Sequence, residues 1–143
     1  MEGFSFCIPY RVRVAEVNYG GHVSNAAILN YFQDARIAFL AALGPYSELN
    51  IGGGCGVIMP EAHVFYRAEL FLGDELLIGV RLAKLGRSSF ELVYRIEREG
   101  EVAAEGSTPL VAFDYQARKP RRLSAEFRAA LQKYVDEGTE GAD

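Results

Sequence analysis

The residues with the greatest chemical potential lie close together near the N-terminus, directly before a long apolar segment. Gly20 and Gly21 precede His22 and Val23, and glycines let a bound molecule approach the backbone closely. If the apolar segment is a helix, the backbone N–H of His22 or Val23 lies at its positive end and can donate to an oxygen that is gaining negative charge. One such donor contributes about 3 kcal/mol to a transition state. The alternative is that the two glycines form a simple turn and His22 is an ordinary residue near the helix start.

A second set of polar side chains could act on a carbonyl group or on water. Asn18 can orient a water or hold a carbonyl oxygen, but an amide does not accept a proton near neutral pH. Asp34 interrupts the apolar segment, and burial would raise its pKa toward that of a useful base; it could instead make a salt bridge. Glu16 lies close enough to Asn18 to serve the same site, or it is a solvated charge. Arg36 could clamp a carbonyl or pair with Asp34.

The elements that must position these residues follow from the spacing of apolar side chains. Apolar and polar residues alternate over 4–14, which predicts a strand, and Pro9 places it at a sheet edge or a bulge. A helix is predicted over 24–43, capped by Ser24 or Asn25 and ended by Gly44 and Pro45. This helix is apolar on nearly every side, so we expect it to be buried all round, with the sheet surrounding it.

The second half of the chain predicts an antiparallel meander followed by a short amphipathic helix. Strands are expected over residues 57–71, 75–85, 88–99 and 101–115, with short turns between them. A surface helix is expected over 124–137. One helix against one curled sheet makes an α+β domain over residues 1–137, with a frayed tail at 138–143.

Composition excludes several classes of protein. The chain has 143 residues, about one domain, and a net charge of −4, which disfavours nucleic acid as a partner. No apolar run reaches the length of a membrane span and no secretory signal is visible, so we expect a cytoplasmic protein that does not bind membranes. Cys7 and Cys55 are expected to be structural, and with two distant histidines they make no zinc site. The glycine-rich segment 52–56 lacks the context of a phosphate-binding loop and is expected to be a linker or lid.

The stretch 13–36, RVAEVNYGGHVSNAAILNYFQDAR, resembles the entry to the central helix of hot-dog-fold acyl-CoA thioesterases of the 4-hydroxybenzoyl-CoA thioesterase class. Further segments follow in the family's order: Tyr66-Arg67, Leu72-Gly73-Asp74-Glu75-Leu76, Gly86-Arg87-Ser88-Ser89-Phe90 and Ala104-Glu105-Gly106. The resemblance covers about residues 4 to 128.

The resemblance implies a hot-dog fold, with a long central helix wrapped by a curled antiparallel sheet and a short C-terminal helix. It also implies a homodimer, or a tetramer of dimers, whose sheets join edge to edge and whose active sites lie at the subunit interface. The implied activity is hydrolysis of an acyl-CoA, or of an acyl carrier protein thioester, to free acid and thiol, without a metal or redox cofactor. The alternatives are a non-catalytic acyl-CoA-binding protein and a hot-dog dehydratase or hydratase, although His22 with Asp34 does not match the pattern expected of the latter.

The chain departs from the family pattern at Asn18, where many relatives have an aspartate that acts as nucleophile or general base. Related subfamilies use asparagine there, some with an acid on the central helix and others with an arginine and no acid. The resemblance therefore implies a catalytic set drawn from Asn18, His22, Asp34, Glu16 and Arg36.

The resemblance also implies residues for the two ends of the substrate. Gly21 and Val23 would contact the acyl thioester. By its residue type, Tyr19 could close over the acyl group or could simply pack within the loop. Arg87, Ser88 and Ser89 would bind the coenzyme A portion, because arginine matches phosphate geometry; the basic residues Lys119, Arg121 and Arg122 form a weaker second candidate. His63 lies in a strand of mixed pattern and is expected to be structural.

Overall fold

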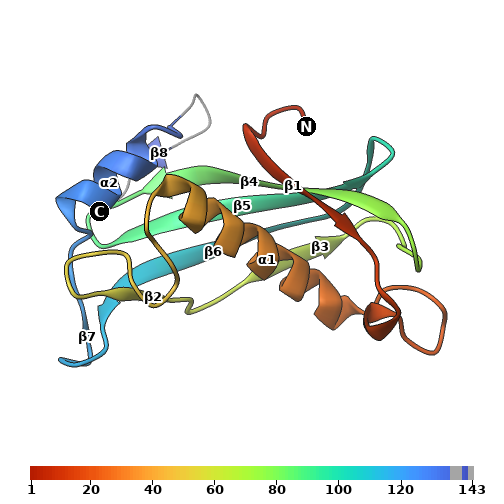
Figure 1. Ribbon diagram of the computed structural model, residues 1–143, viewed down its shortest axis with the longest axis horizontal. Helices are drawn as coiled ribbons and strands as arrows, with labels where there is room; N and C mark the ends of the chain where they lie inside the picture. Colours follow the sequence, from red (N-terminus) through yellow and green to blue (C-terminus); the bar gives the residue numbers. More distant parts are fainter. Residues whose placement is uncertain (136–139, 142–143) are drawn as a thin grey trace.

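In the computed structural model, which describes residues 1–135 and 140–141, one long helix lies across one curved sheet (Figure 1). The helices are α1 (Asn25–Leu43) and α2 (Ala125–Gln132), and a 3-10 turn (Val14–Glu16) precedes α1. The strands are β1 (Phe6–Arg11), β2 (Gly56–Ile58), β3 (His63–Tyr66), β4 (Glu75–Leu85), β5 (Ser89–Arg98), β6 (Glu101–Asp114), β7 (Lys119–Pro120) and β8 (Glu140–Gly141). The expected α+β arrangement is confirmed.

The sheet is an antiparallel meander flanked by the N-terminal strand. Its order is β1-β4-β5-β6-β2, and β3 pairs directly with β6 as well, nearer to the start of β6 than β2 does. β1 lies at one edge, as Pro9 predicted, and β3 lies at the other. The β5–β6 turn has Glu99 and Gly100 both at positive φ, which is the geometry of a tight two-residue hairpin. Register shifts beside Leu82 and Ile96 mark local irregularities, which bend and twist a sheet.

The prediction of one continuous strand over residues 57–71 is wrong. The structure divides it into β2 and β3, which both pair with β6, and residues 59–62 leave the sheet between them. Pro60 lies in this interruption and has no N–H to donate to a ladder. After Tyr66 the N–H groups of Arg67 and Ala68 both donate to the Ala103 carbonyl oxygen, which ends the regular ladder with β6. The result is a short edge strand, β3, instead of a long one.

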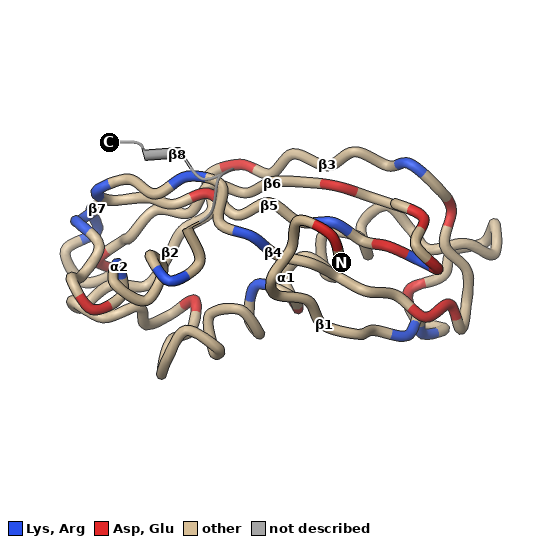
Figure 2. The backbone as a smooth tube through the Cα atoms, turned by 90° about the horizontal axis from the view of Figure 1, so that it is seen from above, with Lys and Arg blue, Asp and Glu red and all other residues tan. Residues whose placement is uncertain are grey.

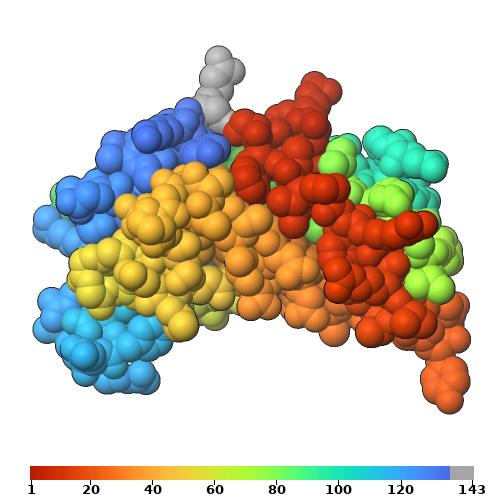
Figure 3. All heavy atoms as spheres, in the orientation of Figure 1, coloured from red at the N-terminus to blue at the C-terminus, as the bar shows by residue number. Residues whose placement is uncertain are grey.

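Helix α1 begins where the sequence predicts, because the Ser24 side chain accepts a hydrogen bond from the Ala27 N–H. The expectation that it is buried on every side is wrong for the single chain. The sheet covers one face only, and residues on the other side, among them Leu29 and Ile37, are 40% and 48% exposed. This outer face is visible between β1 and the loop after the helix (Figure 3). One layer of sheet can bury only one side of a helix.

A close contact between helix and sheet is made by Phe32, whose ring stacks on Tyr94 of β5 with centroids 4.7 Å apart. Gly106 of β6 makes room for the same ring: a Cβ at this position would lie 2.5 Å from Phe32 and 2.6 Å from the His63 carbonyl oxygen. Phe32 is 1% exposed and Tyr94 0%. The absence of a side chain at Gly106 therefore sets how closely α1 lies on the sheet.

The C-terminal helix is shorter than predicted. Ser124 caps α2, and Phe127, Ala130 and Leu131 are buried as expected, but the helix ends at Gln132 instead of 137. The frayed tail expected at 138–143 lies largely outside the described residues; within it, β8 is described and pairs in parallel with β4.

The glycine-rich segment 52–56 forms a compact turn beside α2. The Ile51 N–H donates to the Cys55 carbonyl oxygen, and the Ser124 hydroxyl donates to the Ile51 carbonyl oxygen. Neither described helix is both long and apolar enough to cross a membrane.

We expect Gly106→Ala to lower the free energy of unfolding by about 1–3 kcal/mol, because overpacking displaces neighbouring groups. Urea unfolding of the purified protein measures this. Ser107→Ala, the adjacent residue, is the control and should unfold close to wild type. If Gly106→Ala unfolds at the same urea concentration as wild type, the close contact with Phe32 is not a constraint on the fold.

Candidate functional site

The loop of residues 17–23 is held in a fixed shape by its own hydrogen bonds. The Asn18 N–H donates to the His22 carbonyl oxygen over 3.0 Å, and the Gly21 N–H donates to the Asn18 carbonyl oxygen over 3.0 Å. Gly21 has a φ of +82°, which glycine adopts at little cost. Tyr19 lies at the tip and is fully exposed. The loop therefore presents a defined surface directly before α1.

The Asn18 and His22 side chains converge beside Gly20. The Gly20 N–H donates to Asn18 Oδ1 over 2.9 Å, which leaves the Asn18 NH₂ group as a donor. A Cβ at Gly20 would lie 3.0 Å from His22 Nε2 and 3.3 Å from Asn18 Oδ1. His22 Nδ1 lies 3.4 Å from the Val23 carbonyl oxygen; if it carries the proton, Nε2 has a free lone pair. An amide donor and an imidazole thus lie side by side.

A cavity of about 260 Å³ lies between this loop, the first turn of α1 and the sheet. It is lined by His22, Val23, Asn25, Ile28, Tyr66, Ala68, Glu69, Leu70 and Ala103; we call it the His22 cavity. Of the two amides expected to bind an oxyanion, that of Val23 already donates to the Leu70 carbonyl oxygen over 2.7 Å. The His22 N–H has no acceptor among the described residues, so it stays the candidate donor.

Glu16 is enclosed by hydrogen bonds and is poorly placed to act as a base. Its carboxylate accepts from the Tyr10 hydroxyl, from the Tyr31 hydroxyl over 2.9 Å and from the Arg13 N–H over 2.9 Å. Burial alone would raise the pKa of Glu16, but these hydrogen bonds outweigh it and hold the pKa below its usual value. Burial, and next the hydrogen bond to the Glu16 carboxylate, raise the pKa of Tyr10 to about 12. Glu16 ties β1, the 3-10 turn and α1 together.

Asp34 lines neither the His22 cavity nor a second cavity, which lies beside Arg36 and is described below. It is exposed on α1, and the charged groups that act on it are Glu16 and Arg13. The pKa of Asp34 is raised because neighbouring atoms displace part of its water and because the Glu16 carboxylate repels its negative charge. Successive helix residues are about 100° apart, so Asp34 lies on the flank toward Tyr31 and β1, whereas Gln33 lines a cavity on the flank toward β2 and β6.

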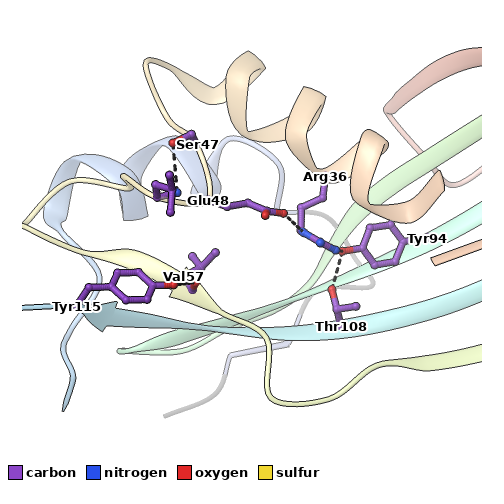
Figure 4. Close-up of polar contacts among 8 residues, drawn as sticks. Arg36, Ser47, Glu48, Val57, Tyr94, Thr108 and Tyr115 are labelled. Atoms are coloured by element: carbon purple, nitrogen blue, oxygen red, sulfur yellow. Dashed lines mark hydrogen bonds and ion pairs between the residues drawn. The ribbon is translucent and has the colours of Figure 1, made fainter. Parts of the chain in front are cut away.

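Arg36 is 6% exposed and lies in a polar network at the middle of α1 (Figure 4). It pairs with Glu48, not with Asp34: its Nε–H donates to the Glu48 carboxylate over 2.6 Å, and Nη1 donates to the Tyr94 hydroxyl over 3.1 Å. Tyr94 and Thr108 hydroxyls lie 2.5 Å apart. The Glu48 pairing is one of the effects that keep the pKa of Arg36 raised against the larger, opposing effect of burial.

This network borders a second cavity of about 300 Å³, the Arg36 cavity. Its lining consists of Leu29, Asn30, Phe32, Gln33, Arg36, Glu48, Val57, Met59, Thr108 and Leu110. Glu48, Thr108 and Gln33 were missed by sequence analysis. They come from three separate segments, and only the folded chain brings them together.

The turn with Arg87, Ser88 and Ser89 lies at the far end of the sheet from His22. His22 bridges Phe71 just before β4 begins, whereas Gly86 follows the end of β4. Eleven strand residues separate the two points, which corresponds to about 33 Å. The basic residues around β7 lie at the same distant end (Figure 2). Within one chain, both groups are therefore too far from the His22 cavity to contact a small group bound in it.

The remaining candidates take no part in either cavity. His63 is exposed, with Nε2 at 3.6 Å from a Glu61 carboxylate oxygen. Cys7 and Cys55 are free thiols. Across residues 1–135 and 140–141, no three His, Cys, Asp or Glu side chains form a metal-binding group.

We expect the free energy of unfolding of Glu16→Gln to fall less steeply than that of wild type as the pH is lowered. Because the folded pKa lies below the ordinary 4.5, the carboxylate stabilises the fold fully above that value, and the stabilisation is lost as the pH falls through the folded pKa. Wild type should therefore lose stability between about pH 5 and 3 more steeply than the variant. Urea midpoints against pH measure this, with the exposed Glu126→Gln as control. Parallel curves for wild type and Glu16→Gln would mean that the Tyr10–Glu16–Tyr31 cluster does not hold the fold.

Known proteins resemble this chain over most of its length. A family model described as the thioesterase-like superfamily matches residues 12–131. The 1,4-dihydroxy-2-naphthoyl-CoA hydrolase of Synechococcus elongatus is 27% identical over 127 residues, which span 87% of this chain and 93% of that protein.

Solved structures agree over nearly the whole chain. A thioesterase from Thermus thermophilus, crystallised with coenzyme A and Zn, has a TM-score of 0.83 at 31% identity and covers 94% of this chain and 96% of its own. A gentisyl-coenzyme A thioesterase has a TM-score of 0.79 at 25% identity over 88% of this chain and 99% of its own. The chain therefore belongs to the thioesterase-like superfamily and has the hot-dog fold.

Proposed function

We propose that the protein is a thioesterase that hydrolyses an acyl-CoA, or an acyl carrier protein thioester, to the free acid and the thiol. The observation that carries this proposal is the loop of residues 17–23, which brings the Asn18 and His22 side chains together beside Gly20 and places His22 in the lining of a cavity at the start of α1. Its relatives support it: one is an acyl-CoA hydrolase and another binds coenzyme A. No cofactor is needed for this reaction.

The chemistry follows from what each group can donate or accept. The thioester carbonyl oxygen accepts from the His22 N–H at the positive end of α1, which stabilises the charge that develops on it. The Asn18 amide holds the attacking water, and His22 Nε2 takes one of its protons. When the tetrahedral intermediate collapses, the C–S bond breaks and the imidazolium returns the proton to the leaving thiolate. Asp34, on the other flank of α1, is the alternative base.

We further propose that the enzyme is a dimer joined through β3. This strand lies at the sheet edge, and Phe65 and Tyr66 are 56% and 49% exposed there. An unpaired edge with apolar side chains favours pairing with another strand. In an antiparallel pair centred on Phe65, Phe65 of one copy lies opposite Phe65 of the other, and Tyr66 lies opposite Val64.

Such a dimer completes the site from both copies. Tyr66 lines the His22 cavity, and Val64, which lies opposite it on the second copy, pairs with Gly106, two residues before Thr108 of the Arg36 cavity. The His22 cavity of one copy would thus face the Arg36 cavity of the second. The two-fold axis also makes the strands of the second sheet run in the opposite direction. The Arg87 turn of the second copy therefore lies toward the end where the first copy has His22. This arrangement gives Arg87, Ser88 and Ser89 a route to the coenzyme A portion that a single chain does not offer.

Hydrolysis of an acyl-CoA panel with short, long and aromatic acyl groups, followed by release of free thiol, tests the activity. We expect Asn18→Ala and His22→Ala to lower kcat/KM by about a hundredfold or more, as removal of positioned acid–base and oxyanion groups does. Asp34→Asn should stay within a few-fold of wild type.

Two other outcomes would change the assignment. Loss of activity in Asp34→Asn with full activity in His22→Ala would transfer the role of base to Asp34. Binding of acyl-CoA without turnover by wild type would favour the non-catalytic binding protein.

We expect Phe65→Glu to produce monomers, because two carboxylates would meet across the two-fold axis. Since the site needs both copies, kcat/KM should fall as the dimer is lost. Light scattering after size-exclusion chromatography measures the mass, and Leu49→Glu, which also places a carboxylate at an exposed apolar position, is the control. A Phe65→Glu protein that keeps the oligomeric state of wild type would show that β3 is not the dimer edge.

A further inference from the structure

The Arg36 cavity combines a balanced charge pair with unused hydrogen-bond donors, and we propose that it is the subsite for the far end of the acyl group. It accepts acyl groups that end in an uncharged hydrogen-bond acceptor, and Glu48 is the residue that excludes acyl groups ending in a carboxylate. This inference rests on the proposed thioesterase function and names a substrate class for it.

The donors come from a directed chain of hydrogen bonds (Figure 4). Arg36 Nη1 donates to the Tyr94 hydroxyl oxygen. The Tyr94 and Thr108 hydroxyl oxygens lie 2.5 Å apart and either can donate, so a ligand acceptor beside Thr108 selects the state in which Tyr94 donates to Thr108 Oγ1. The Thr108 hydroxyl then has its own proton left to donate, and Thr108 lines the cavity. Bonds in such a chain polarise and strengthen one another. Arg36 Nη2 has no acceptor among the described residues, which adds a second donor.

Two amide side chains supply further polar contacts. Asn30 and Gln33 line the same cavity, and neither side chain makes a hydrogen bond within residues 1–135 and 140–141. The rest of the lining is apolar, with Leu29, Phe32 and Leu110 among its walls. Polar and apolar residues thus share the lining equally, and polar groups placed among apolar walls orient a small organic ligand. The cavity volume of about 300 Å³ is at the lower end of such sites.

Charge decides which acceptor is bound. Arg36 and Glu48 are the charged residues in the cavity lining, and their 2.6 Å contact leaves the cavity with no net charge. A ligand carboxylate would gain the attraction of Arg36 but would also meet the Glu48 carboxylate at close range, and it would lose its own hydration. An amide, ketone or hydroxyl oxygen accepts from Thr108 and Arg36 without that cost. Glu48 thus determines selectivity by charge.

The position of the cavity suits an acyl end. In the proposed dimer it faces the His22 cavity of the second copy, where the thioester carbonyl would lie. Arg36 itself is held by α1, by the loop that contains Glu48 and by β5, so its guanidinium is fixed before a ligand arrives. A pre-positioned donor loses little entropy on binding.

Three acyl-CoA substrates of nearly the same shape separate these effects: 4-carbamoylbenzoyl-CoA, 4-carboxybenzoyl-CoA and 4-isopropylbenzoyl-CoA. They end in a neutral acceptor, a carboxylate and an apolar group. For wild type we expect kcat/KM for the carbamoyl substrate to exceed that for the isopropyl substrate by about tenfold and that for the carboxy substrate by about a hundredfold.

The variants test the assigned residues. Glu48→Gln should raise the carboxy-to-carbamoyl ratio of kcat/KM at least about tenfold, because Arg36 becomes an unbalanced positive charge beside the ligand. Thr108→Val should lower the carbamoyl-to-isopropyl ratio, and Thr108→Ser should restore it. Glu126→Gln, which makes the same charge change on exposed α2, should leave both ratios at their wild-type values.

The outcomes separate this inference from the proposed function. If wild type hydrolyses all three substrates equally, or if Glu48→Gln leaves the ratios unchanged, the subsite is wrong while thioester hydrolysis stands. If wild type hydrolyses none of them, binding of the three corresponding thioether analogues is measured by calorimetry. A wild-type preference for the carbamoyl analogue that Glu48→Gln shifts toward the carboxy analogue would then support the subsite and overturn the hydrolase.

Discussion

The buried guanidinium of Arg36 is the interaction on which the rest of the structure depends. A charge with 6% exposure must be paired and hydrogen-bonded, because removing it from water without partners is strongly unfavourable. Its partners come from the loop after α1 and from β5, and the chain of hydrogen bonds continues to β6. These partners fix where α1 lies along the sheet. The stacking of Phe32 on Tyr94, one turn away, then adds apolar contact at the same point.

With α1 fixed in this position, its two flanks acquire different chemistry. The flank toward β1 carries Tyr31, which donates to Glu16 and holds the segment that leads into the loop of residues 17–23. The flank toward β2 and β6 carries Gln33 and the opening beside Arg36. The loop directly before the helix supplies the His22 N–H. One helix therefore positions the loop, the candidate oxyanion donor and the second cavity.

Much of this arrangement could be predicted from the sequence, because local patterns determine it. The cap at Ser24, the tight turn at Glu99-Gly100 and the edge position of Pro9 each depend on residues adjacent in the chain. The interruption at Pro60 had a local signal as well. The partners of Glu16 and Arg36 had none, since Tyr10, Tyr31, Glu48 and Tyr94 come from segments that meet only after folding. Glu16 and Arg36, two charged candidates for catalysis, are held by contacts that hydrophobic periodicity does not reveal.

The uncovered side of α1 and the free edge at β3 have one physical origin. A single layer of sheet that does not close on itself retains open edges, and a helix packed on one layer of sheet retains an open face. Both cavities lie along this margin, where backbone donors, side-chain amides and apolar walls are accessible together. A second copy that pairs with β3 would cover the margin and remove water from it, which strengthens every hydrogen bond to a bound carbonyl. In this arrangement the candidate site lies where the single chain is incompletely buried, because the surfaces that a second copy would cover are also the ones that a substrate can reach.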